Sequence, residues 1–528
     1  MNWHTAAAPP GERSRRRPIG RRLLGGAGST EGGARASGPA RLLLRRARGA
    51  LAQIPRAAWI CALVATLNAA CWSIIAPPFQ AVDEPAHFAY VQQLAENHRL
   101  PTSNSFKFAE EEETVLRDLR HKQVEWHPET PTFSSAAEQR RLTSDLAEHP
   151  SRRGDGAAGG ASNDPPLFYL LETMPYVLAS SGTLLDQLEA MRLLSALMAG
   201  LTALFVFLFV RETLPSFRWA WTVGGLSVAL APSLGFMSGV VNPDAMLFAV
   251  SAAIFYCLAR GFRRGLTHRL AVAIGLLTVA GYLTKLNFIG LIPGVILALT
   301  VLTVRAARTQ GRRSAWTSFA AALGLAAGPV CLYALANLLS NRAALGTVST
   351  TLRQVGGVTS ISAELSYVWQ YYLPRLPGMT TYFPGLSMAR LWFDRSVGLY
   401  GWLDTSFPVW VDNLALVPAA LLALLGVRAA VVGRTALRRR LAEISVYGTM
   451  GVGLMAVIGA TSYFNNEHAN FVEPRYLLPL LPLLGVALAL AARGAGRRWG
   501  PAAGALIVVL FLAHNIFSQL LVVSRFYG

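Results

Sequence analysis

Two adjacent carboxylates, Asp83 and Glu84, follow the first long apolar run of the chain, just after Pro77-Pro78. Charged side chains cost about 3 kcal/mol or more inside hydrocarbon, so acids this close to a membrane edge indicate a function. A carboxylate at a membrane surface can take the proton of a hydroxyl group. The same residues also fit a helix start, with Asp83 as the N-cap and Pro85 just inside. The pattern leaves both interpretations open.

Histidines near these acids add possible binding groups. His87 lies four residues after Asp83, so the two side chains share one face of a helix. A lone histidine in this setting is more often a hydrogen-bonding neighbour than a metal ligand. His121, Glu125 and His127 are metal-ligand types at close spacing, but acidic and Gly-rich stretches around them predict a polar loop. No metal site is predicted, although a divalent metal stays possible.

Three cations stand where predicted membrane helices begin or end. Lys285 interrupts the apolar stretch GYLTKLNF, and it is the only lysine after Lys122. An ionisable group at this depth indicates a binding site for an anion such as a lipid phosphate, although the side chain could also reach the interface by snorkelling. Arg475 and Arg192 occupy similar positions, and Glu473 could simply pair with Arg475. If the three cations converge, they form a phosphate site.

Two further acids have competing interpretations. Asn242, Pro243 and Asp244 stand in GVVNPDAM, where Asn242 and Pro243 fit a helix start better than a binding site. Asp404, in GWLDT, is either a surface acid or a group that faces a cavity between an external segment and the membrane. We therefore include Asp404 among the candidate substrate-binding residues.

The composition requires a membrane protein. Of 528 residues, 53% are hydrophobic, and many apolar runs approach the twenty residues that cross a bilayer. Residues 1–56 hold twelve Arg and two Glu, which accounts for more than half of the net charge of +19. This Gly/Pro/Ala/Arg-rich stretch predicts a disordered cytoplasmic tail near anionic lipid, and no nucleic-acid partner is expected. The four cysteines lie in apolar runs and predict no disulfide framework.

The apolar runs predict an all-α polytopic fold with about eleven membrane helices, at 57–76, 190–210, 219–237, 243–260, 270–284, 286–304, 316–338, 411–432, 444–462, 475–492 and 500–522. Eighteen arginines lie in the connections 211–218, 260–269, 305–313, 428–440 and 493–498. The positive-inside rule assigns these connections and the N-terminus to the cytoplasm, which leaves the C-terminus external.

Two large external segments remain, at 77–189 and 339–410. In the first, residues 165–180 are apolar but short and contain Glu172 and Pro175, which predicts an interfacial helix on the outer leaflet. The second is rich in Trp and Tyr, residues typical of a lipid–water boundary. The transmembrane domain with both segments is expected to cover residues 57–523.

Several motifs resemble those of a bacterial family of uncharacterised multi-span membrane proteins. They are E-P-A-H-F after the first span, N-D-P-P-L-F-Y-L-L, V-N-P-D-A-M, the T-K pair, G-W-L-D-T and P-R-Y-L-L-P-L-L-P. That family is similar in plan to the GT-C glycosyltransferases, which take sugars from polyprenyl-phosphate carriers on the external face. The resemblance covers about residues 57–523.

The resemblance implies an inverting glycosyltransferase in the plasma membrane. Its catalytic base is expected at Asp83 or Glu84, with Asp83 favoured, and its carrier-phosphate site at Lys285 and Arg475. The implied partners are a polyprenyl-phosphate-linked sugar donor, a cell-envelope glycan or lipid acceptor, and membrane lipids. A transporter or flippase of lipid-linked glycans, or a non-catalytic scaffold of the cell envelope, remains an alternative.

Overall fold

A computed structural model describes residues 53–101, 107–132, 135–154, 159–339, 344, 360–464 and 472–528. The chain divides into two units, Met1–Ile54 and Pro55–Gly528, and every element below belongs to the second. The basic tail predicted at 1–56 lies outside the described residues, apart from its last four positions.

Nine helices of the described chain are long and apolar enough to cross a membrane. Each has at least 20 residues, which at ~1.5 Å per residue spans about 30 Å of hydrocarbon. They are α2 (Arg56–Ile75), α8 (Leu184–Thr213), α11 (Asp244–Arg264), η2 (Leu286–Leu291) continued by α13 (Ile292–Gln310), α14 (Arg312–Leu339), α18 (Val409–Val432), α20 (Leu441–Phe464), η4 (Pro474–Leu480) continued by α21 (Leu481–Gly494), and α22 (Gly500–Tyr527).

The predicted all-α polytopic fold is confirmed, whereas the count of eleven spans stays a prediction. The helices α9 (Arg218–Ala229) and α10 (Pro232–Ser238) bend by 53° and form a tenth span if they are taken together. The helix α12 (His268–Thr284) is apolar but has only 17 residues. It therefore covers ~26 Å, somewhat less than the usual hydrocarbon thickness.

The break between α9 and α10 has a local cause and a consequence for the site. Pro232 begins α10, a position where its missing N–H costs nothing. Gly235 of α10 packs so closely on α2 that a Cβ atom there would lie 2.4 Å from the indole of Trp72. This close approach brings the chain after α10 beside the end of α2, where the backbone N–H of Val241 reaches Glu84.

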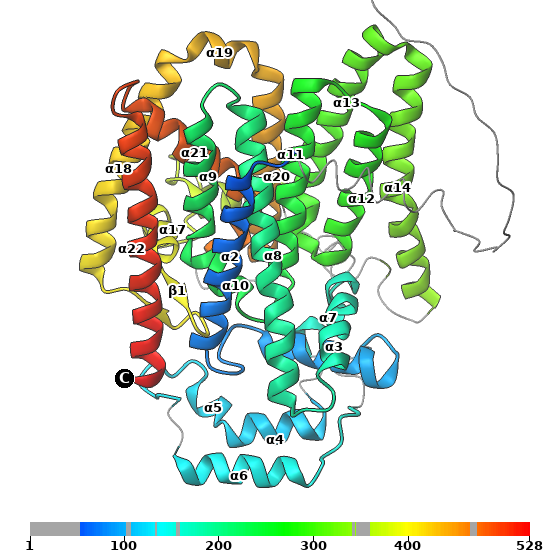
Figure 1. The fold of residues 1–528 in the computed structure, drawn as a ribbon, viewed down its shortest axis with the longest axis vertical. Helices are drawn as coiled ribbons and strands as arrows, with labels where there is room; N and C mark the ends of the chain where they lie inside the picture. The colour runs from blue at the N-terminus through cyan, green and yellow to red at the C-terminus, as the bar shows by residue number, and fades with distance from the viewer. Residues whose placement is uncertain are drawn as a thin grey trace, which may run out of the picture. The chain divides into compact units, whose positions relative to one another are not determined.

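The first external segment forms a group of short helices at one end of the helical bundle (Figure 1). They are α3 (Glu84–Asn97), α4 (Glu110–Asp118), α5 (His121–Val124), α6 (Ala136–Ala147), the 3₁₀ turn η1 (Gly159–Asn163) and α7 (Leu167–Leu178). The helix α7 buries Tyr169 and Glu172 but exposes Leu170, Met174 and Leu178. This one-sided apolar surface suits the interfacial helix predicted at 165–180.

The second external segment contains α16 (Ile361–Tyr372), α17 (Met388–Val397) and a short hairpin, β1 (Leu399–Tyr400) and β2 (Thr405–Ser406). The strands are antiparallel, with Leu399 opposite Ser406. Gly401 takes the left-handed backbone conformation (φ 61°) that this tight turn requires. Tyr400 stacks on Trp72 of α2 with ring centroids 5.3 Å apart, which anchors the hairpin to the bundle.

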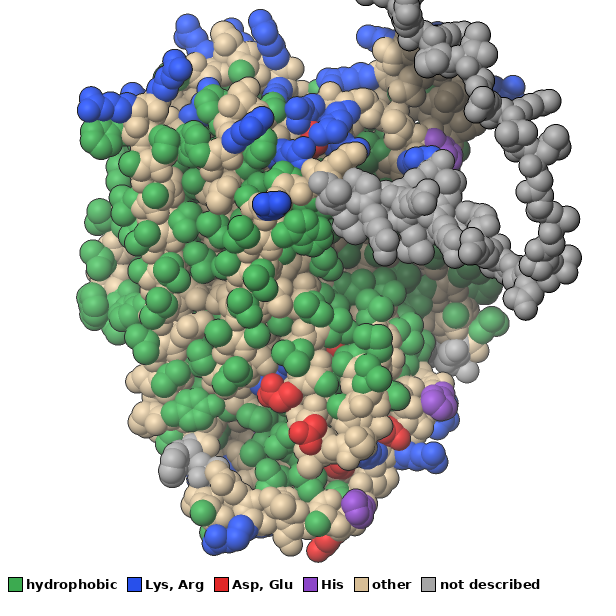
Figure 2. Space-filling view, in the orientation of Figure 1, with side chains coloured by type: hydrophobic (Ala, Val, Ile, Leu, Met, Phe, Trp, Pro, Cys, Tyr) green, Lys and Arg blue, Asp and Glu red, His purple; other side chains and the backbone are tan. Residues whose placement is uncertain are grey.

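Charged side chains are divided between the two ends of the bundle. Lys and Arg gather at the end where α19 (Arg434–Arg439) lies, whereas the Asp and Glu visible on this face lie mostly toward the end with the external helices (Figure 2). The apolar surface between these ends is the part that would contact lipid.

Candidate functional site

Asp83 stands at the start of α3 but does not cap it. Its backbone is left-handed (φ 64°, ψ 1°), and its side chain makes no capping hydrogen bond. The carboxylate instead points outward, with the side chain 53% exposed, and its Oδ2 accepts a hydrogen bond of 3.4 Å from Nη2 of Arg475. The helix-cap interpretation therefore accounts for the position of Asp83 but not for its side chain.

Glu84, the next residue, is fully buried in an ion pair with Arg192. Arg192 donates from Nε to Oε1 at 2.8 Å and from Nη2 to Oε2 at 2.6 Å. Backbone N–H groups of Phe79 and Val241 also donate to the carboxylate, each at 3.0 Å. All four bonds lie inside the protein, so both side chains are held by the fold, and their predicted roles at the substrate stay predictions.

Arg475 lies in η4, at the point where the chain re-enters the bundle, and its side chain is only 8% exposed. Its Nε donates to Oε2 of Glu473 at 2.5 Å, and its guanidinium lies 5.0 Å from the ring centroid of Tyr476. Its Nη1 is buried and has no hydrogen-bond acceptor among the described residues. A buried donor without an acceptor costs about 1–3 kcal/mol, which a bound anion would offset.

Lys285 lies between α12 and η2, and its backbone is extended there. Its side chain therefore projects from the junction of the two elements. Its Nζ is 2.7 Å from Oδ1 of Asp244, in the first turn of α11, and 5.4 Å from the ring centroid of Tyr476. Tyr476 therefore lies beside both Lys285 and Arg475, so two of the three cations that the sequence singled out lie close to each other.

His87 belongs to a hydrogen-bonded chain of three side chains. Its Nδ1 lies 2.9 Å from the hydroxyl of Tyr169, and that hydroxyl donates to Oδ2 of Asp164 at 3.0 Å. Burial lowers the pKa of His87 well below 6.5, and the nearby charge of Lys285 lowers it further. His87 is therefore neutral at pH 7 and acts as a hydrogen-bonding group.

The sequence did not single out Asp164 as a chemical group. Burial raises its pKa from 3.8 to about 6, although Lys285 and the hydrogen bond from Tyr169 oppose this shift. Asp83 acts on the same carboxyl and raises its pKa. Asp83 and Lys285 are far apart in the sequence, yet the charges of both act on the pKa of Asp164. This fits a shared site.

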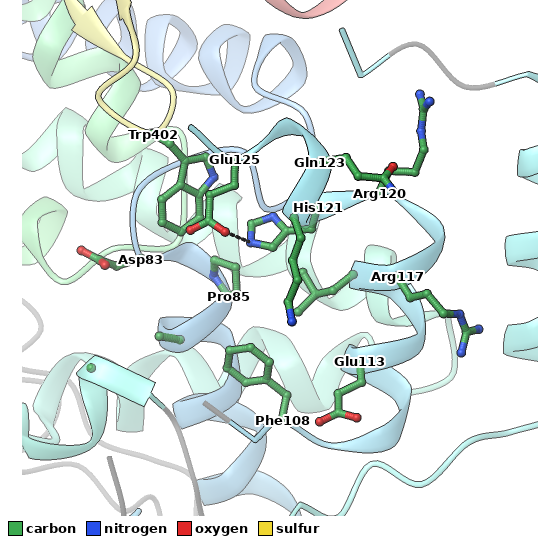
Figure 3. A pocket seen from close by; sticks show the side chains of 14 residues that line it. Asp83, Pro85, Phe108, Glu113, Arg117, Arg120, His121, Gln123, Glu125 and Trp402 are labelled. Atoms are coloured by element: carbon green, nitrogen blue, oxygen red, sulfur yellow. Dashed lines mark ion pairs between the residues drawn. The ribbon is translucent and has the colours of Figure 1, made fainter. Parts of the chain in front are cut away.

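Asp83 also lies on the wall of a cavity of about 770 Å³ beneath the external helices (Figure 3). Figure 3 shows Asp83 at one edge, Trp402 of the hairpin beside Glu125 and His121, and Arg117 on the far side. Nε2 of His121 is 3.6 Å from Oε2 of Glu125. The indole ring and the charged groups give the cavity both an apolar face and polar partners.

Asp404 does not face this cavity. Its Oδ2 pairs with Nη2 of Arg525 at 3.2 Å, and both side chains are nearly buried. Arg525 also donates to the carbonyl of His127 at 2.8 Å, so the pair joins the hairpin, α22 and the first external segment. The predicted contact of Asp404 with substrate stays a prediction, while Trp402, two residues earlier, lines the cavity.

Several residues of this site were missed in the sequence, namely Asp164, Tyr169, Asp244, Trp402 and Tyr476. The motif N-D-P-P-L-F-Y contains two of them, Asp164 directly before two prolines and Tyr169 in the helix that follows. Asp244 was assigned to a helix start, and it does stand in the first turn of α11. Its pairing with Lys285 depends on tertiary structure. Among the described residues, no group of three or more His, Cys, Asp or Glu side chains is arranged to hold a metal ion.

This fold and site define a polytopic helical membrane protein with a charged pocket at one end of its bundle. The model of the family described as predicted membrane protein (DUF2142) matches residues 67–484, which is most of the chain. The chain belongs to this family, and the resemblance to a family of multi-span membrane proteins is confirmed.

No curated protein sequence matches the chain. Among solved structures, the chain is similar to the crystal structure of the Archaeoglobus fulgidus oligosaccharyltransferase in the apo form, with a TM-score of 0.41 and 12% sequence identity. The match covers 89% of this chain and 56% of the oligosaccharyltransferase. The chain thus spans little more than half the length of that protein.

Proposed function

We infer that the protein is a membrane glycosyltransferase that moves a sugar from a polyprenyl-phosphate carrier to a cell-envelope acceptor on the external face. The observation that carries this proposal is the pairing of an open carboxylate with buried cations. Asp83 is half-exposed on a large cavity, and it contacts Arg475, whose Nη1 has no acceptor among the described residues. Such a site can hold a base and a phosphate next to each other.

The proposed reaction is a displacement at the anomeric carbon with inversion. Asp83 takes the proton of an acceptor hydroxyl while that oxygen forms a bond to the anomeric carbon. The bond from this carbon to the carrier phosphate oxygen breaks, and the phosphate keeps the electron pair. Arg475 and Lys285 stabilise the charge that develops on the phosphate, and this buried environment strengthens their effect.

The cavity supports an acceptor site on the aqueous side of Asp83. Its volume of about 770 Å³ falls in the range of ~300–1,000 Å³ typical of small-molecule pockets. Trp402 supplies an aromatic face, and Glu113, His121 and Glu125 supply polar groups for sugar hydroxyls. A glycan acceptor suits this mixture better than a purely apolar lipid does.

The proposed orientation follows from the separation of charges. Because Lys and Arg gather at the end with α19, the positive-inside rule assigns that end to the cytoplasm (Figure 2). The cavity at the other end is then external, as is the end of α22.

The test is transfer of radiolabel from a polyprenyl-phosphate-linked sugar to a glycan acceptor by the full chain in lipid nanodiscs. Asp83→Asn keeps the shape but cannot accept a proton, so the rate is expected to fall by ~10²–10⁴-fold. The matched control is Glu129→Gln, which removes a negative charge from the same segment outside the cavity lining and is expected to keep the wild-type rate.

Two results contradict the proposal in different ways. If Asp83→Asn transfers label as fast as the wild type, Asp83 is not the base. If the wild type transfers label from no donor but moves a lipid-linked sugar across a liposome bilayer, the protein is a transporter.

A further inference from the structure

A second polar cavity lies at the arginine-rich end of the bundle, opposite the candidate active site. It has a volume of about 110 Å³ and is lined by Glu212, Phe262, Arg263, Arg305, Arg439, Arg440 and Glu443. These residues come from α8, α11, α13, α19 and the start of α20. Five helices and the connecting residue Arg440 thus bring four cations and two acids around one small space.

The two acids are already held by the protein. Nη1 of Arg263 donates to Glu212 at 2.9 Å, and Nη2 of Arg264 donates to its other oxygen at 2.5 Å. Glu443 accepts a hydrogen bond of 3.1 Å from Tyr447. Because two arginines donate to Glu212, the negative charge of this lining residue is neutralised.

Three of the four lining arginines form no ion pair with the residues that the structure describes, and for Arg305 and Arg439 no side-chain hydrogen bond is found there either. Arg305 lies 5.3 Å from the ring centroid of Phe262. Arg440, the third, donates to the carbonyl of Thr213. The lining carries four positive and two negative charges, so its net positive charge favours an anion.

The surface around the cavity identifies the source of such an anion. Val304, Leu441 and Ile444 are 43%, 59% and 41% exposed, and each stands next to a lining residue in the sequence. Arginines at this level therefore adjoin apolar surface that faces lipid tails. Basic pockets between membrane helices at this depth suit the headgroups of anionic lipids.

We propose that this cavity is a binding site for the headgroup phosphate of an anionic phospholipid, with Arg305 and Arg439 as its principal ligands. A volume of 110 Å³ exceeds the ~30 Å³ of one liquid water, so a phosphate group fits. Guanidinium groups bind phosphate oxygens through paired hydrogen bonds. The proposal does not depend on glycosyl transfer, because it concerns the opposite end of the molecule.

The test measures binding of dioleoylphosphatidylglycerol to the full chain in phosphatidylcholine nanodiscs. Arg305→Gln/Arg439→Gln is expected to weaken binding roughly 30-fold, which is ~1 kcal/mol per arginine converted at ~1.4 kcal/mol per tenfold. The matched control is Arg308→Gln/Arg434→Gln, which changes the same number of charges on the same two helices outside the cavity. This control is expected to bind as the wild type does.

Three results overturn the proposal. The first is an equal loss in both double variants, since diffuse surface charge would then explain binding. The second is displacement of the lipid by inorganic phosphate, which would make the ligand a free anion. The third is unchanged binding in Arg305→Gln/Arg439→Gln. If that variant does not fold, Arg305→Lys/Arg439→Lys replaces it, and loss of the paired guanidinium bonds is then expected to weaken binding while the control stays unchanged.

Discussion

Asp83 and Glu84 are neighbours in the chain, and each meets an arginine, yet their surroundings are opposite. Glu84 and Arg192 are both 0% exposed, whereas Asp83 is 53% exposed and Arg475 is 8% exposed. One pair is closed on every side by backbone groups, and the other opens onto a cavity. The difference shows that only the second pair leaves a carboxylate open to solvent, as the proposed base requires.

The buried pair of Glu84 and Arg192 also holds the backbone next to Asp83 in place. Besides Glu84, Arg192 donates to the carbonyls of Ser73, Ala76 and Pro77, at 2.9, 2.8 and 3.1 Å. These carbonyls lie at the end of α2, where a cation is favourable. The ion pair thus ties the end of α2 to the start of α3, one residue away from Asp83.

Breaking the closed pair is expected to have the largest effect. Glu84→Ala leaves Arg192 charged and buried without its acid, a change that costs about 3–5 kcal/mol of stability. The measurement is the thermal midpoint in detergent, together with the yield of folded protein.

Two comparisons sharpen this prediction. Asp83→Asn is expected to keep the wild-type thermal midpoint, because its side chain is half-exposed. Glu84→Leu/Arg192→Leu is expected to remain unstable, since the N–H groups of Phe79 and Val241 also lose their acceptor. If the double variant melts as the wild type does, these backbone bonds are unimportant.

The second-largest effect is expected for a substitution at Lys285, and it concerns the rate of sugar transfer. Lys285→Met removes a cation from the proposed leaving phosphate and is expected to lower sugar transfer by ~10²–10³-fold. The same change leaves Asp244 buried without its partner and lowers stability. The readouts are the transfer rate and the thermal midpoint.

A second variant separates these two effects. Lys285→Met/Asp244→Asn removes both charges, so stability is expected to recover while transfer stays low. Recovery of transfer in this variant contradicts a role for Lys285 in phosphate binding.

The smallest effect concerns pH. The pKa of Asp164 is about 6 in the folded protein and 3.8 for an ordinary aspartate, so between these values the folded state holds more protons than the unfolded state. Stability from this group is present below about pH 4 and falls as the pH rises to about 6. Asp164→Asn lacks this titration, so its thermal midpoint relative to the wild type is expected to rise across that window. If the difference in thermal midpoint between Asp164→Asn and the wild type does not change with pH, the raised pKa of Asp164 is contradicted.

The sequence predicted the fold well because span length and arginine placement are local properties. It also singled out Asp83, Lys285 and Arg475, which the structure brings near one another, since a charge inside or beside an apolar run is visible without a structure. Whether such a charge is open or closed depends on residues far away in the chain. Glu84 meets Arg192, 108 residues later, and Asp404 meets Arg525, 121 residues later. No spacing rule reveals such partners, so the buried pairing of Glu84, Arg192 and Asp404 could not be predicted from the sequence.

Selection for stability alone would not favour an aspartate with the left-handed backbone of Asp83. This conformation costs most L-residues about 1–2 kcal/mol, and glycine adopts it freely. Asp83→Gly is therefore expected to relieve local strain and to raise the thermal midpoint, while it removes the proposed proton acceptor. An acid in this strained conformation therefore marks a position where the proposed activity and the stability of the protein favour different residues.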